Sequence, residues 1–224
     1  MTAAREAFLQ RVRRAVQDGN RVGQAPLLPE RGGVGYQGAG SDPVTRFCNE
    51  FTASGGQAHA VGDTEVATAC VLKLVEAKAA RSVLIGRGAA LDNLNLGKGL
   101  NRLGVEILHV DGLQIDAREP LFAADLAITG VDYLVAETGS LAILTRPDNP
   151  RSLSLLPPVH VAVARADQIV PDLFDLFDLE TWGATLSLPS CISLITGPSK
   201  TGDIELRLVT GVHGPGEVHV VLIA

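Results

Sequence analysis

Ser82-Val-Leu-Ile-Gly-Arg-Gly88 is a short apolar run that ends at a glycine-rich turn. Its length and its β-branched residues predict a buried strand. On either side of this run the apolar residues take a helical spacing, over about 64–80 before it and 89–102 after it. Two more short runs, 57–61 and 105–110, predict neighbouring strands. Strands that alternate with helices at such short intervals predict an α/β fold, with a mainly parallel sheet covered by helices on both faces.

The turn Gly86-Arg87-Gly88 is similar to the start of a dinucleotide-binding loop. It lacks the third glycine of the Rossmann fingerprint at the required position. We therefore interpret it as a structural turn rather than as a cofactor site.

The first 41 residues differ from the rest of the chain. Residues 3–18 carry apolar residues near a helical period, and 20–42 are rich in glycine and proline, which indicates a linker or an extended arm. Asp42-Pro43 then predicts a capped helix over about 43–54, because proline is favoured at the first position after an N-cap. We expect an N-terminal arm over 1–41 and one globular domain over 42–224.

Composition narrows the classes of function. The 19 Lys and Arg against 25 Asp and Glu give a net charge of −6, which argues against a nucleic-acid partner. The three cysteines are far apart and never form Cys-x-x-Cys, so we expect neither a disulfide framework nor a metal or iron–sulfur site in this chain. The charged N-terminus and the lack of any run of about 18 apolar residues predict no membrane span and a cytoplasmic protein.

Two strand-like runs, 132–136 and 141–145, flank Glu137-Thr-Gly-Ser140. One interpretation is simple hairpin turn chemistry. The other starts from Glu137, which leaves an apolar strand at a tight turn and can enter a cleft as a base or polar anchor. Thr138, Gly139 and Ser140 would then help to hold an anionic ligand.

A second polar corner follows the apolar run 192–195, which we interpret as a buried strand. Beyond it, the sequence supplies two hydroxyls, a cation, flexible backbone and a helix N-cap within a few residues, as an anion site requires. The residues are Gly197, Ser199, Lys200, Thr201 and Asp203. A plain strand–turn–helix junction explains the same residues about equally well.

Two histidines could join these corners. His213 lies in a Gly/Pro turn near the Lys200 segment in sequence, and its ordinary pKa suits a proton donor. His160 begins a predicted strand, and we favour a position at a sheet edge over one in a cleft.

Three motifs together resemble the lactate utilization protein C family, the small single-domain branch of the LUD-domain proteins. They are Ile128-Thr-Gly-Val-Asp-Tyr-Leu-Val-Ala-Glu-Thr-Gly-Ser-Leu141, Leu155-Leu-Pro-Pro-Val-His160, and Ile195-Thr-Gly-Pro-Ser-Lys-Thr-Gly-Asp-Ile-Glu205 with Val212-His-Gly-Pro215. The resemblance covers about 42–224. It implies a Rossmann-like α/β fold similar to the glucosamine-6-phosphate isomerase, ribose-5-phosphate isomerase and CoA-transferase group.

The resemblance also implies a function. Family members are associated with the oxidation of L-lactate to pyruvate, together with two partner proteins that carry iron–sulfur clusters. This chain shows no cofactor motif of its own. Glu137-Thr138-Gly139 also matches the Glu-x-Gly turn of class I CoA-transferases, so a stand-alone transferase or isomerase that uses Glu137 is the alternative, and a non-catalytic assembly protein is a third.

Overall fold

The computed structural model describes residues 3–19, 38–109, 118–177, 189–202 and 208–224. Its contacts divide the chain into two units, Met1–Tyr36 and Gln37–Ala224. The first unit contains helix α1 (Ala3–Gly19), close to the helix expected over 3–18. The Gly/Pro-rich stretch over 20–37, interpreted above as a linker, lies outside the described residues.

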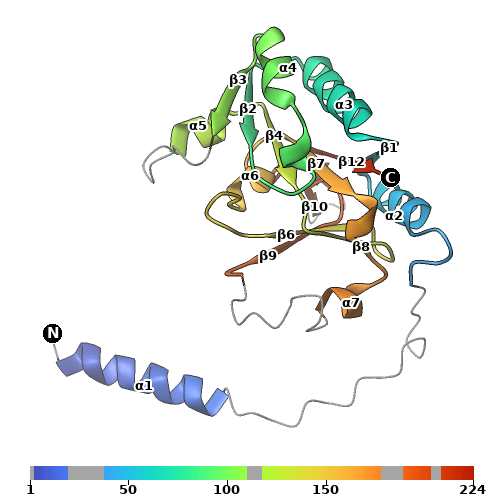
Figure 1. Ribbon diagram of the computed structural model, residues 1–224. Coiled ribbons are helices and arrows are strands. Elements are labelled where there is room, and N and C mark those ends of the chain that lie inside the picture. The colour runs from blue at the N-terminus through green and yellow to red at the C-terminus, as the bar shows by residue number, and fades with distance from the viewer. Residues whose placement is uncertain (1–2, 20–37, 110–117, 178–188, 203–207) are drawn as a thin grey trace. The chain divides into compact units, whose positions relative to one another are not determined.

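The second unit is built on a six-stranded sheet with the order β1-β12-β7-β4-β2-β3 (Figure 1). All of its described pairings are parallel. The strands are β1 (Gln57–Val61), β2 (Ser82–Ile85), β3 (Glu106–His109), β4 (Leu126–Gly130), β7 (Val159–Arg165) and β12 (Glu217–Ile223). The expected parallel α/β architecture is therefore confirmed.

Helices cover both faces of this sheet (Figure 1). On one face, residues of α3 (Thr64–Ala77), η1 (Leu91–Asn93) and α4 (Leu96–Arg102) pack on alternate residues of β2, β4, β7 and β12. On the other, α2 (Pro43–Ala53) packs with Phe47 and Phe51 in the core, and α6 (Ser152–Leu155) with Leu153. A short helix α5 (Arg118–Ala123) leads into β4.

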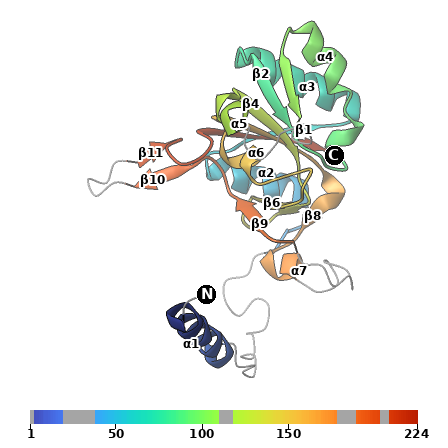
Figure 2. The same cartoon turned by 90° about the vertical axis from the view of Figure 1, so that its left-hand side faces the viewer.

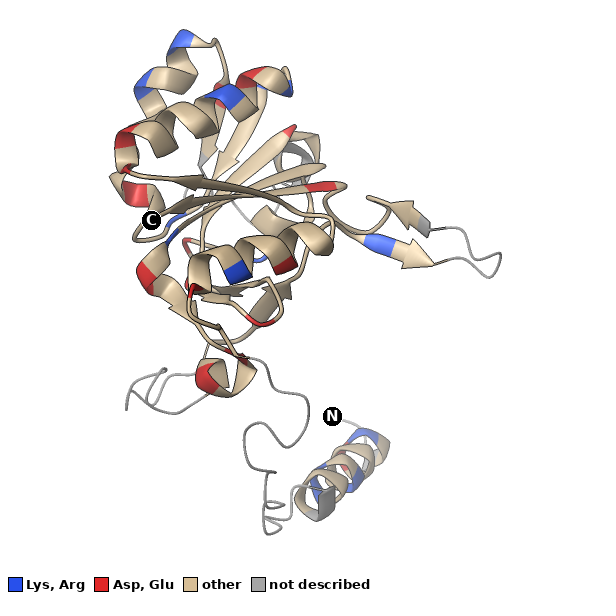
Figure 3. Ribbon diagram, turned by 90° about the vertical axis from the view of Figure 1, so that its right-hand side faces the viewer, with Lys and Arg blue, Asp and Glu red and all other residues tan. Residues whose placement is uncertain are grey.

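Two helix starts follow directly from the sequence. Asp42 caps α2, and its Oδ1 accepts from the Thr45 N–H at 3.1 Å, with proline at the first helical position. Asp63 caps α3 in the same way, with Oδ1 accepting from the Val66 N–H at 2.8 Å. Charged residues of both signs alternate along these two helices (Figure 3).

A second, four-stranded sheet lies beside α2 and has the order β8-β5-β6-β9. The strands are β5 (Tyr133–Val135), β6 (Ser140–Leu144), β8 (Ile169–Val170) and β9 (Ile192–Ile195). The 3₁₀ turn η3 (Ala166–Gln168) joins β7 to β8. One face of this sheet packs on α2 and the large sheet through Leu134 and Leu141, and the other packs against α7 (Leu173–Phe177) through Val135 and Ala142. The hairpin expected over 132–145 is confirmed, but it belongs to this separate sheet.

Three expectations were wrong in part. The helix expected over 89–102 is split into η1 and α4, because Leu94 between them is extended. The run 192–195 is a half-exposed edge strand rather than a buried one. Among the described residues that follow it, none is helical: β10 (Lys200–Gly202) pairs with β11 (Leu208–Thr210) in a small antiparallel sheet that stands apart in Figure 2.

Candidate functional site

The two polar corners meet at one end of the four-stranded sheet. β5 ends and β6 begins there, and β9 ends beside them, since Leu141 pairs with Ile195. Glu137 follows β5 and is half-buried, and its backbone N–H donates to the Pro171 carbonyl at 3.0 Å. The pairing therefore brings 137–140 and 196–199 to the same edge.

A chain of three hydroxyls connects the corners. Ser140 Oγ lies 2.8 Å from Thr138 Oγ1 and 2.7 Å from Thr196 Oγ1. Ser140 is buried, whereas Thr138 is half-buried and Thr196 is exposed. Each hydroxyl can donate or accept, so the chain is able to pass a proton or to hold an anion at its exposed end.

Two glycines let both corners pack on the carboxyl-terminal part of α2. Gly139 has φ +62, and a Cβ there would lie 2.2 Å from the Phe51 nitrogen. Gly197 has φ +108, and a Cβ there would lie 2.7 Å from the Ser54 carbonyl oxygen. These positions require glycine both for the left-handed backbone and for the close approach.

Lys200 has a structural contact at this corner. Its Nζ donates to the carbonyl oxygen of Ser54, the residue that caps the end of α2, at 2.6 Å. A cation at this place complements the negative end of the helix dipole. The ammonium carries three N–H donors, and this bond uses one of them.

Ser199 and His213 lie on a different side of the same segment. The Ser199 N–H donates to the Pro215 carbonyl at 2.9 Å, and its own carbonyl accepts from the Gly211 N–H at 2.9 Å. The turn 211–215 therefore runs along Ser199. His213 is exposed and lines a largely apolar pocket of about 350 Å³ with Phe122, Leu155 and Val212. Neither Glu137 nor Lys200 is among the residues that line this pocket.

The remaining predicted site residues are placed as follows. Thr201 is half-buried in β10 opposite Val209, on a strand rather than on the turn before a helix. Asp203 lies outside the described residues. The structure thus joins Thr138, Gly139, Ser140, Gly197 and Lys200 around the end of α2, and it places His213 in a separate hollow.

Sequence reasoning misplaced His160. β7 lies between β4 and β12, and His160 is fully buried with its Nε2 2.8 Å from Thr129 Oγ1. Burial, and secondarily the neighbouring His219, lowers the pKa of His160 to about 4. The continuous apolar run that follows His160 was the available signal, because it is typical of a strand buried on both faces.

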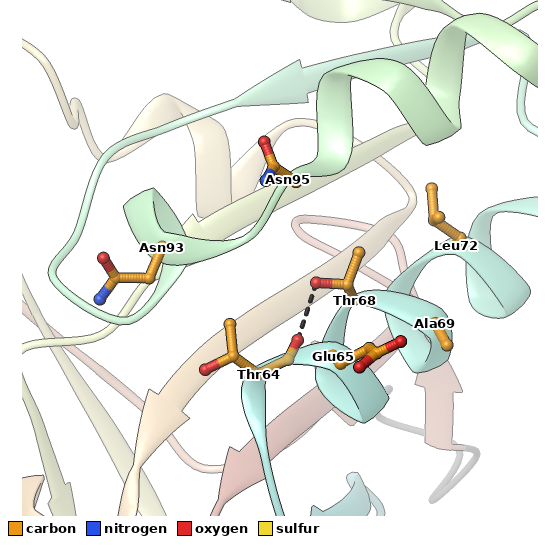
Figure 4. Close-up of a pocket in the computed structure, with 7 residues that line it drawn as sticks. All are labelled: Thr64, Glu65, Thr68, Ala69, Leu72, Asn93 and Asn95. Atoms are coloured by element: carbon orange, nitrogen blue, oxygen red, sulfur yellow. Dashed lines mark hydrogen bonds between the residues drawn. The ribbon is translucent and has the colours of Figure 1, made fainter.

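Two further pockets lie on the α3 and α4 side of the large sheet. One, of about 470 Å³, is lined by Thr64 and Thr68 of α3 and by Asn93 and Asn95 (Figure 4). Thr68 Oγ1 donates to the Thr64 carbonyl, and Asn93 Nδ2 donates to the Ala89 carbonyl. The other, of about 210 Å³, opens at the carboxyl end of β2.

Within the described ranges, we find no group of three or more His, Cys, Asp or Glu side chains placed to hold a metal ion. In the same ranges, no helix combines the length and the apolar character that crossing a membrane requires.

Comparison with known proteins finds relatives that carry the same name. A protein of Halalkalibacterium halodurans named lactate utilization protein C is 37% identical over 145 residues, which are 63% of this chain and 62% of that protein. The Bacillus subtilis protein of the same name is 37% identical over 103 residues, which are 45% of this chain and 43% of that protein. The matched regions therefore span less than two thirds of either relative.

A solved structure shares the fold. The crystal structure of a DUF162 family protein from Deinococcus radiodurans matches with a TM-score of 0.58 and 23% identity, over 81% of this chain and 96% of that chain. The family model of the LUD domain matches residues 44–223, which are nearly the whole second unit. The chain therefore belongs to the LUD domain family.

Proposed function

We infer that the chain is a cytoplasmic subunit of a lactate utilization system. In this proposal the system oxidises L-lactate to pyruvate, and partner proteins with iron–sulfur clusters carry the electrons. The observation that supports it most is the shared name of the relatives, lactate utilization protein C, at 37% identity over 145 residues.

The proposed ligand is a small carboxylate or phosphate anion bound beside the Lys200 ammonium, which offsets the negative carboxyl end of α2. Lys200 supplies positive charge, and the hydroxyls of Thr138 and Ser140 supply donors. Ser199, on the other side of the segment, and Thr201, on β10, are further candidate donors. Glu137 is the base or polar anchor. The bond between Ser140 and Thr196 supports this assignment, because it holds the Glu137 turn and the Lys200 segment at one place.

His213 lies apart from Glu137 and Lys200. A proton donor must come within hydrogen-bond reach of the reacting group, and His213 lines a hollow that neither Glu137 nor Lys200 lines. In this proposal His213 reaches the ligand only from the Ser199 side of the segment, and Asp203 is a further candidate ligand residue.

Growth tests this function. The gene is deleted in its own organism, and growth is measured on lactate and on pyruvate as sole carbon source. We expect growth to fail on lactate alone and to return when the unaltered gene is restored. Restoration by Glu137→Gln and Lys200→Ala together, with normal protein levels, would exclude this corner as the working site, whereas unaffected growth of the deletion strain would exclude the function.

A stand-alone transferase that uses Glu137 is the second candidate. The half-buried Glu137 at the start of a tight glycine turn favours it. Its carboxylate would attack the thioester carbonyl of an acyl-CoA, form an acyl anhydride on the protein and release the CoA thiolate. Mass spectrometry of the purified protein with acetyl-CoA, compared with Glu137→Gln, decides this case: only a Glu137-dependent adduct supports it.

A further inference from the structure

One small part of the second unit projects from its body. Strands β10 and β11 form a two-stranded ribbon that stands away from both larger sheets in Figures 2 and 3. Among the described strands, neither of the two pairs with a third, so each presents a free hydrogen-bonding edge. A two-stranded hairpin alone in water is marginally stable, and another chain can pair with an exposed strand edge. The ribbon is therefore a surface that a partner would stabilise.

An apolar hollow lies at the base of this ribbon. It has a volume of about 350 Å³, and the turn 211–214, which directly follows β11, forms one part of its wall. The other part comes from α5, α6 and the segment that leads into β7. Three large apolar side chains that line the hollow are exposed to water: Phe122 by 67%, Val212 by 53% and Leu155 by 40%. Apolar side chains gathered in the open at one place are typical of an interaction site.

Few charged groups belong to this surface. None of the residues that line the hollow is a Lys, Arg, Asp or Glu. In the described strands of the ribbon the single charged residue is Lys200, and its ammonium donates to the Ser54 carbonyl of the same chain. Charged residues make up 20% of the whole chain, so they are depleted here, as they are in the cores of protein–protein interfaces.

This lack of charge favours a second copy of the chain as the partner. A dimer with two-fold symmetry brings the same surface of both copies together, so a charged group near the axis would face its like. Two chains of net charge −6 repel each other, and the repulsion is weakest where neither surface carries charge. A nucleic acid, an anionic membrane or a strongly charged protein would instead be recognised by a patch of opposite sign.

The surface also holds both halves of a self-complementary contact. Phe122 is exposed at the rim, and a hollow of this size takes a drug-sized molecule and hence also a phenylalanine ring. In a two-fold dimer every contact occurs twice, with the roles of the copies exchanged. One protruding ring and one hollow on each copy therefore give two equal contacts, in which Leu155 and Val212 can pack on the ring.

We propose that this surface joins two copies of the chain in a symmetric dimer. Phe122 of each copy enters the hollow of the other between Leu155 and Val212, and the ribbon of each copy packs on the other beside this contact. The exposed apolar side chains are buried by the pairing. The proposal does not depend on the lactate function, and its test does not involve growth on lactate.

Sedimentation velocity of the purified full chain over a range of concentrations tests the dimer. We expect a mass of two chains at about 0.1 mM and dissociation on dilution, as for a dimer of micromolar affinity. Phe122→Ala should weaken association about tenfold or more, because a buried aromatic side chain carries much of the binding free energy of an interface. Phe177→Ala is the matched control and should not change association, since Phe177 is 53% exposed on α7 and does not line the hollow.

A mixture of two variants tests the symmetry of the contact. Phe122→Ala lacks the protruding ring, whereas Val212→Trp fills the hollow, so neither variant can make the contact with its own kind. In a mixed pair, Phe122 of the Val212→Trp chain can enter the open hollow of the Phe122→Ala chain. We therefore expect the mixture to associate about tenfold more strongly than either variant alone.

Melting curves provide a second measurement and show that the variants fold. The melting temperature of the unaltered chain should rise with protein concentration, as it does for a dimer, and that of Phe122→Ala should not. A monomer at about 0.1 mM for the unaltered chain would overturn the proposal. Undiminished association of both Phe122→Ala and Val212→Trp, or a mixture that associates no better than its components, would overturn it as well.

Discussion

Ser140 Oγ lies 2.7 Å from Thr196 Oγ1, although 56 residues separate the two along the chain. This contact joins the turn after β5 to the end of β9, and Ser140 also lies 2.8 Å from Thr138 Oγ1. The polar end of the small sheet is therefore one connected group.

Replacing Ser140 should loosen this group. We expect Ser140→Ala to lower the free energy of unfolding by about 1 kcal/mol, because a buried hydroxyl loses two partners while Thr196 can turn to water. Urea unfolding followed by circular dichroism measures the change. Ser190→Ala, at an exposed serine, should stay within about 0.5 kcal/mol of the unaltered chain. Equal losses of stability in Ser140→Ala and Ser190→Ala would show that the hydrogen bonds of Ser140 do not stabilise the fold.

Gly139 allows a test that separates backbone strain from steric clash. We expect Gly139→Ala to destabilise the fold by about 3 kcal/mol or more, because its Cβ would lie 2.2 Å from the Phe51 nitrogen, on backbone that cannot move aside. Gly104→Ala is the matched control, since Gly104 has φ +70 but nothing within 4 Å of a Cβ. It should cost about 1 kcal/mol, from the left-handed backbone alone. If denaturant unfolding gave similar losses of stability for Gly139→Ala and Gly104→Ala, the Gly139 turn would not be in close contact with α2.

Lys200 should contribute little to stability if its main role is to bind a ligand. Lys200→Ala removes the bond to the Ser54 carbonyl, and we expect a loss of about 0.5–1 kcal/mol from an exposed helix end. Growth on lactate should nevertheless fail with this variant. Lys73→Ala, on an exposed part of α3, is the control for both measurements. A loss of several kcal/mol would instead make Lys200 a structural residue first.

Because His160 is buried, we expect the free energy of unfolding to fall as the pH is lowered. Its pKa in the fold is about 4, below the ordinary 6.5, so the unfolded chain binds the extra proton first. The stability that neutral His160 contributes is complete above about pH 6.5 and is lost as the pH falls to about 4, by about 3 kcal/mol. Unfolding curves between pH 4 and 7 measure it.

The control for this prediction is a difference between variants, because other groups also titrate there. Burial lowers the pKa of His59 and of His219, and their effect has the same sign. We expect His160→Gln to give a flatter curve than the unaltered chain. A curve of equal steepness in His160→Gln would assign the pH dependence to other residues.

The local sequence was sufficient to predict an element where one or two residues fix the backbone conformation at its start or turn. Asp42 identified the start of α2, and the Glu137–Ser140 turn identified a hairpin. The local sequence was insufficient where the structure of a segment depends on the strand with which it pairs. The segment at Lys200 reads equally well as a turn before a helix, and its pairing with β11 makes it a strand. No local pattern says which sheet receives β5 and β6. For His160, the apolar run that follows it was the one local signal of a buried central strand, and the neighbours β4 and β12 are set by distant pairing.

The candidate sites show the same limit. Ser140 and Thr196 were both visible as hydroxyls, but their contact depends on the register of β6 against β9.

The position of β12 has a consequence for synthesis on the ribosome. This strand comes late in the chain and inserts between β1 and β7, which are separated from it by about 156 and 52 residues at their ends. Until Glu217–Ile223 have emerged, β1 has no described neighbour in the large sheet, and β7 has an unpaired edge. The nascent domain therefore exposes unpaired strand edges until β12 is made, and the pairing of such distant segments favours slow closure of the sheet.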